Sequence, residues 1–69
     1  MTASEMAVFG VYKAFVAKAG TPKVSVALRQ ISEATGYSVA HCDRIRQRLV
    51  AMGLMRRVGV SSPWRVEVL

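Results

Sequence analysis

A chain of 69 residues has room for one small domain, because a domain of this size buries only about 60% of the surface that its unfolded chain exposes. Hydrophobic residues make up 52% of it and the mean hydropathy is +0.28, which excludes a disordered polar chain and predicts a single folded domain over residues 1–69. Ten Lys and Arg residues outnumber four Asp and Glu residues, so the net charge of +6 favours a polyanionic partner, nucleic acid above all.

The first predicted element is a helix that begins with a capping box, Thr-Ala-Ser-Glu at residues 2–5, and ends at Gly-Thr-Pro, residues 20–22. Its predicted core face consists of Val8, Val11, Tyr12, Phe15 and Ala19. Two lysines interrupt the apolar residues 6–19, and Glu5 stands where a secretory signal carries positive charge. We therefore expect neither a signal peptide nor a membrane partner, and a single cysteine favours a cytoplasmic location.

The opposite side of this helix carries a strip of small residues with few charges. Its members are Ala7, Gly10, Ala14 and Ala17. Two interpretations stay open: small residues are tolerated on an exposed helix, or the strip lets a second copy approach closely and forms the seam of a homodimer. A chain with more apolar side chains than one small core can bury is compatible with the dimer.

The middle of the chain contains two short elements. Residues 23–26, Lys-Val-Ser-Val, are β-branched at alternate positions and predict one brief strand. Leu28, Ile31 and Ala34 keep helical spacing in a second helix, and Gly36 stands where a left-handed residue would end it.

A third helix is predicted over Val39–Ala51, with Ser38 as its N-cap. Its predicted buried stripe consists of Cys42, Ile45, Leu49 and Met52. Cys42 is the only cysteine and His41 the only histidine, so we expect no disulfide, no metal site, no cofactor and no catalytic activity.

After this helix the apolar pattern changes from helical to alternating spacing. Residues 54–58 and 64–68 predict two strands, and residues 59–63 between them complete a hairpin. Trp64 is predicted to anchor the hairpin or the core. The predicted order is helix, strand, helix, helix, strand, strand.

Two short helices joined by Gly-Tyr-Ser, the second rich in arginine and followed by a hairpin, make a winged helix-turn-helix arrangement. Residues 28–59 resemble the helix-turn-helix and the first wing strand of MarR-like, Lrp-like and related small bacterial or phage regulators. The resemblance lies in the turn glycine, an isoleucine where the two helices meet, and the Leu-Val-Ala-Met-Gly-Leu exit at residues 49–54. It implies an α+β winged helix-turn-helix fold and a transcriptional regulator that binds double-stranded DNA in the cytoplasm of a bacterial cell or a phage-infected host.

The third helix is the element expected to enter the major groove. Arg44 suits a guanine edge and Gln47 an adenine edge, whereas arginines farther round the helix and on the hairpin suit phosphates. The full set of predicted DNA contacts is Ser38, His41, Arg44, Arg46, Gln47, Arg48, Arg56, Arg57, Ser61, Ser62 and Arg65.

Asp43 opposes this interpretation, because phosphates repel a carboxylate unless it accepts from cytosine or pairs with Gln47 or Arg46. Asp43 and the apolar first helix favour an alternative, a winged-helix interaction module that docks on a host protein such as a transcription or replication factor. The two hypotheses differ in salt response, because contacts between arginines and phosphates weaken steeply with added salt.

Overall fold

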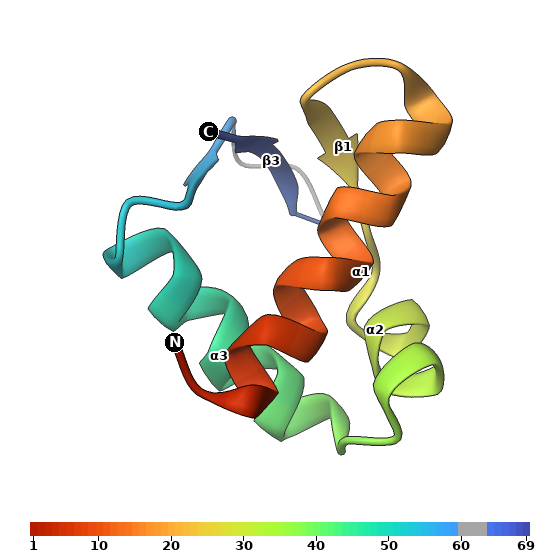
Figure 1. The fold of residues 1–69 in the computed structure, drawn as a ribbon, viewed down its shortest axis with the longest axis vertical. Coiled ribbons are helices and arrows are strands. Elements are labelled where there is room, and N and C mark those ends of the chain that lie inside the picture. Colours follow the sequence, from red (N-terminus) through yellow and green to blue (C-terminus); the bar gives the residue numbers. More distant parts are fainter. Residues whose placement is uncertain (60–63) are drawn as a thin grey trace.

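The computed structural model describes residues 1–59 and 64–69 of the chain, and the predicted contacts Ser61 and Ser62 lie outside them. Within this part, three helices and a three-stranded antiparallel sheet form an α+β fold (Figure 1). The elements are α1 (Ala3–Ala19), β1 (Lys23–Ser25), α2 (Leu28–Thr35), α3 (Val39–Ala51), β2 (Met55–Arg57) and β3 (Arg65–Val68). None of the helices described here is long and apolar enough to cross a membrane.

Both ends of α1 are closed as the sequence predicts. The Glu5 backbone N–H donates to Thr2 Oγ1 at 3.2 Å, and the Thr2 backbone N–H donates to Glu5 Oε1 at 2.8 Å. At the other end Gly20 has φ of 70° and its N–H donates to the Val16 carbonyl at 2.9 Å. These bonds satisfy backbone groups that a helix end otherwise leaves free.

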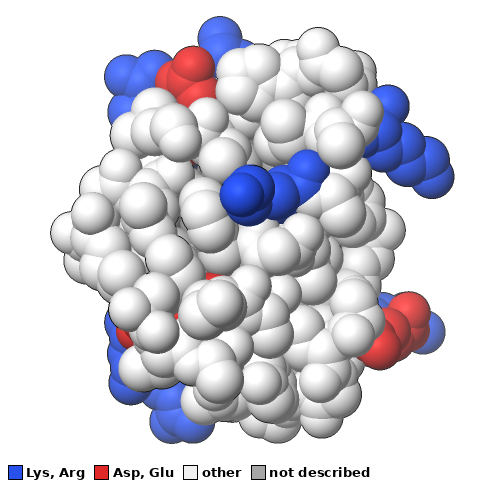
Figure 2. All heavy atoms as spheres, viewed as in Figure 1, with Lys and Arg blue, Asp and Glu red and all other residues white. Residues whose placement is uncertain are grey.

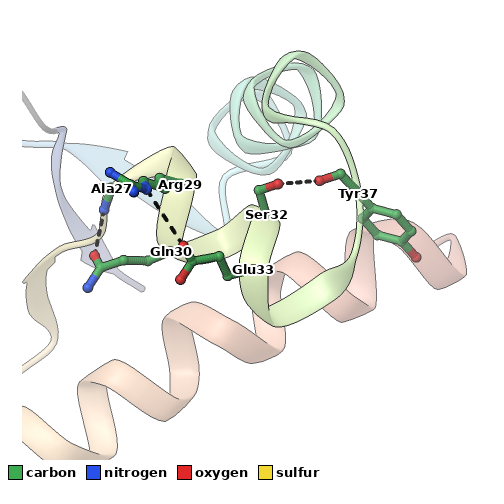
Figure 3. A network of polar contacts seen from close by, with 6 residues as sticks. All are labelled: Ala27, Arg29, Gln30, Ser32, Glu33 and Tyr37. Carbon is green, nitrogen blue, oxygen red and sulfur yellow. Dashed lines mark hydrogen bonds and ion pairs between the residues drawn. The ribbon is translucent and has the colours of Figure 1, made fainter.

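Side chains of α2 hold the turn that leads into α3 (Figure 3). The Ala27 N–H donates to Gln30 Oε1 at 3.0 Å at the start of α2, and the Ser32 hydroxyl donates to the Tyr37 carbonyl at 2.6 Å beyond its end. Thr35 Oγ1 accepts from the Tyr37 N–H at 3.3 Å, and Gly36 between them has φ of 79°. The angle between α2 and α3 therefore depends on a turn fixed by local polar contacts.

The sheet differs from the sequence prediction, which kept the strand after the first helix apart from a two-stranded hairpin. β1 and β2 both pair antiparallel with β3, so the strand order is β1-β3-β2. Val24 lies opposite Val66, and Met55 lies opposite Val68. The short β1 thus covers an edge of β3 that a hairpin would leave unpaired.

The core lies between α1, α3 and one face of the sheet. Its buried members are Val8, Tyr12, Val24, Val26, Ile31, Cys42, Ile45, Leu49, Met55 and Val66. Two predicted core residues are outside it: Ala19, the last residue of α1, is exposed, and Met52 is 48% exposed. Met52 follows the end of α3, where Gly53 with φ of 78° turns the chain, and Met55 enters the core instead.

Candidate nucleic-acid interface

α3 packs on the protein through one side and leaves the other side accessible. Cys42, Ile45 and Leu49 are fully buried, which fixes the rotation of the helix about its axis. The helix begins at the exposed Ser38, whose hydroxyl oxygen accepts from the His41 N–H at 3.1 Å. In Figure 1 this end of α3 and the turn before it lie at the opposite end of the molecule from the sheet.

The side of α3 that faces away from the core carries two of the predicted base-contacting residues. Arg44 and Gln47 are exposed, and Ala40, one turn before Arg44, is a small exposed residue that leaves the space above it open. Among the residues described, no carboxylate forms an ion pair with Arg44. Its guanidinium therefore carries an uncompensated charge at the centre of this face.

Arg48 and His41 lie at the margins of the face. Arg48 is exposed, and its Nη1 lies 3.9 Å from Glu5 Oε2, so α1 draws its guanidinium to one side. His41 is half-buried and its ring meets the Tyr37 ring edge-on, with 5.1 Å between centroids. Both side chains have neighbours in the protein that limit their reach, whereas Arg44 projects into solvent.

Arg46 is buried and not on the surface, where its predicted phosphate contact would require it to be. It is 5% exposed, its guanidinium carbon lies 3.8 Å from the centroid of the Trp64 ring, and its Nη2 donates to Asp43 Oδ1. Position 46 follows Cys42 by one turn, so the helix directs it towards the core and the start of β3. Stacking on an aromatic face and a charge-assisted hydrogen bond replace part of the water that burial removes.

Asp43 is engaged within α3 through both of its oxygens. Oδ1 accepts from Arg46, and Oδ2 accepts from Gln47 Nε2 at 3.0 Å. This is one of the arrangements that the sequence allowed for this carboxylate. Its negative charge is therefore balanced locally and does not face the solvent alone.

The register of the sheet separates the arginines of the hairpin onto two faces. Arg56 lies opposite Glu67 and pairs with it, and Arg65 lies two residues from Glu67 on the same outer face. Arg57 lies opposite the buried Val66, on the face that packs against the helices, and its guanidinium carbon is 4.2 Å from the Trp64 centroid.

Trp64 thus contacts one arginine from α3 and one from β2. Of the hairpin arginines that the structure describes, Arg57 is the one that contacts this tryptophan. The sequence pattern does not reveal this pairing, because it depends on a tryptophan just before β3 meeting a residue on a helix that precedes it in the chain.

Two polar atoms under this site are buried without a hydrogen-bond partner in the part of the chain that is described, Tyr12 Oη and Arg46 Nε. Burial raises the pKa of Tyr12 to about 12, and the neighbouring Arg46 guanidinium opposes part of that increase. Tyr12 is therefore a neutral phenol at physiological pH. It belongs to the support of α3, since its ring fills the core between α1 and α3.

Charge is distributed unevenly over the surface. Figure 2 shows the face over which α1 passes. Most of this face is uncharged, one basic side chain lies near its middle, and most of the other charged side chains lie at its edges. The strip predicted as a dimer seam is on α1: Gly10, Ala14 and Ala17 are exposed and Ala7 is half-buried.

Comparison of the chain with protein-family models, curated proteins and solved structures finds no match.

Proposed function

We propose that this protein is a winged helix-turn-helix domain that binds double-stranded DNA and regulates transcription, with α3 in the major groove and the β2–β3 hairpin as the wing. The observation that carries the proposal is the exposed face of α3, where Arg44 and Gln47 follow the small Ala40. A helix whose outer face is polar and includes a small residue fits the major groove. Arginine and glutamine are the side chains that recognise guanine and adenine there.

The proposed contacts divide into base recognition and phosphate binding. Arg44 donates two hydrogen bonds to guanine O6 and N7, and Gln47 pairs with adenine N6 and N7. Ser38 and the free N–H groups of the first turn of α3 bind a phosphate, as helix N-termini do. Arg57, held against Trp64, and Arg48 contact phosphates on either side of the groove.

Arg56 and Arg65 have a smaller part in this arrangement. Both lie on the outer face of the sheet, and the Glu67 carboxylate already pairs with Arg56. His41 contacts DNA from the margin of the face, because Tyr37 holds its ring close to the protein.

A homodimer would raise the specificity of such a domain. One copy of α3 reads only a few base pairs, and dimers of helix-turn-helix proteins place two reading helices about 34–36 Å apart on successive turns of DNA. The strip Ala7, Gly10, Ala14 and Ala17 of α1 is the proposed seam, since its side chains allow two helices to pack closely.

The proposal is tested by selecting binding sites from random duplex DNA at moderate salt, followed by measurement of the affinity for the selected site over a range of salt concentrations. We expect a short motif, and a logarithm of the binding constant that falls linearly with the logarithm of salt concentration, by about 0.9 for each phosphate contact. Recovery of no motif together with no binding at low salt would contradict the proposal.

A second candidate is a protein-interaction module that docks on a host transcription or replication factor. It is favoured by the largely uncharged face over α1 and by the exposed Met6 on that helix (Figure 2). An apolar contact of this kind persists at high salt, whereas DNA binding through arginines does not. The salt series described above therefore also separates the two candidates.

A further inference from the structure

The carboxylate of Asp43 connects a buried residue of α3 with an exposed one. Its Oδ1 accepts from Arg46, which packs in the interior against Trp64, and its Oδ2 accepts from Gln47, which faces solvent. A carboxylate has no hydrogen to donate, so only the nitrogen end of the Gln47 amide can bond to it.

The anchor of this network is held firmly. Arg46 is 5% exposed and stacked on an aromatic ring, so its guanidinium has little freedom to move. The ion pair of Arg29 and Glu33 in α2 provides a contrast, because its side chains are 87% and 71% exposed and a long pair of this kind is weak (Figure 3). Asp43 is thus bonded to a fixed group, and Gln47 is bonded to Asp43.

The direction of the Gln47 amide decides which base it recognises. With Nε2 bonded to Asp43, the amide retains its carbonyl oxygen as an acceptor and its second N–H as a donor. Adenine offers the matching pair in the major groove, the N6 amino group as donor and N7 as acceptor. An unrestrained glutamine can rotate its amide and present two N–H groups to a guanine edge instead.

We infer that Asp43 is a positioning residue that sets base preference: through Arg46 it fixes the Gln47 amide in the orientation that selects adenine, and it makes no contact with DNA itself. The inference rests on the proposed function, because it specifies how one residue of the proposed reading face acts. It also explains how a carboxylate can belong to a face that approaches phosphates.

The substitution Asp43→Asn tests this with little change in shape. The asparagine carbonyl remains bonded to Arg46, so its amino group now faces Gln47 and attracts the glutamine carbonyl oxygen. The Gln47 amide is then reversed. At the same time one negative charge is lost near the phosphates, which strengthens binding to all duplexes.

The experiment compares the wild type, Asp43→Asn, Gln47→Ala and the double variant on the selected duplex and on three duplexes that differ at one base pair. That base pair is the one at which Gln47→Ala removes the preference. We expect the wild type to prefer adenine there by about fivefold or more. Asp43→Asn should reduce that preference to about twofold or less, or move it to guanine, while its affinity for non-specific duplex rises. In the Gln47→Ala background, Asp43→Asn should raise the affinity for every duplex and leave the base preference unchanged.

A loss of stability would lower specific and non-specific binding together. A lower adenine preference combined with a higher affinity for non-specific duplex therefore separates positioning from a structural role. An adenine preference that survives Asp43→Asn overturns the inference and leaves the proposed DNA binding intact, whereas a wild type that binds no duplex overturns both. Nuclear magnetic resonance of the free wild-type protein gives a further measurement that needs no variant. The Gln47 side-chain amide proton bonded to Asp43 should exchange slowly with solvent and have a chemical shift displaced from that of a free glutamine. Exchange rates and shifts equal to those of a free glutamine would overturn the inference.

Discussion

α1 and α3 are the two longest helices, with 17 and 13 residues, and they pack against each other while exposing opposite kinds of surface. α1 presents small residues and Met6 on a largely uncharged face (Figure 2). α3 presents Arg44, Gln47 and Arg48. The net charge of +6 does not by itself identify the binding surface. The proposed polyanion site belongs to α3, whereas an apolar contact would belong to α1.

The largest effect is expected where the two helices share one core. Ile45→Ala removes a fully buried side chain of α3 and should lower the free energy of unfolding by about 2–5 kcal/mol, enough to unfold much of so small a protein. Val39→Ala on the exposed side of the same helix is the matched control and should change it by less than about 0.5 kcal/mol. Urea denaturation measures both, and equal effects would contradict the buried side assigned to α3.

The next prediction separates the two helices by charge. Arg44→Ala should cost about 1–3 kcal/mol of affinity for the selected duplex and relax its preference at one base. Arg57→Ala should weaken binding to all duplexes alike and lower the salt slope by about 1. Lys18→Ala removes one positive charge from the exposed end of α1 and serves as the control. If Lys18→Ala weakens binding as much as Arg44→Ala, the total charge and not the face of α3 determines affinity.

The sequence predicts well those features that neighbouring residues determine. The bounds of α3, its cap at Ser38 and the capping box of α1 are as expected, because each depends on residues within a turn or two of one another. The two successive helices α2 and α3 and the position of the glycine between them follow for the same reason.

The differences between prediction and structure arise from contacts between distant segments. Helical spacing alone cannot show that Trp64 covers Arg46, so a charged residue was expected at the surface. β1 pairs with β3, which follows it by about forty residues, and a pattern of alternate apolar residues predicts a strand but not its partner. The role of Ser32 in holding the Tyr37 carbonyl has no signal in the apolar pattern either.

A smaller and equal effect on stability is expected from removing the two helix caps. Thr2→Ala and Ser38→Ala each remove a hydroxyl that accepts from a backbone N–H, which should lower the free energy of unfolding by about 1 kcal/mol. Only Ser38→Ala should also weaken duplex binding, because only that cap lies at the proposed interface. Thermal unfolding and binding assays on the same two variants test this difference, and loss of binding in both would remove the assignment of Ser38 as a DNA contact.

The smallest effect is expected on the exposed side of α1, where Gly10→Ala should raise the stability of the monomer by about 0.5–1 kcal/mol, because glycine inside a helix loses more conformational freedom than alanine. A Cβ at this position would meet nothing within 4 Å. Gly20→Ala is the matched control of opposite sign, since φ of 70° at the end of the same helix disfavours alanine.

The same variant decides between the two interpretations of the small-residue strip. A seam formed by close approach at Gly10 would be widened by the added methyl group, so sedimentation should show more monomer although each monomer is more stable. A more stable protein whose self-association is unchanged, or a wild type that is monomeric at every concentration, would assign the strip to the ordinary surface of a helix. The proposed DNA recognition would then depend on α3 and the hairpin of a single copy.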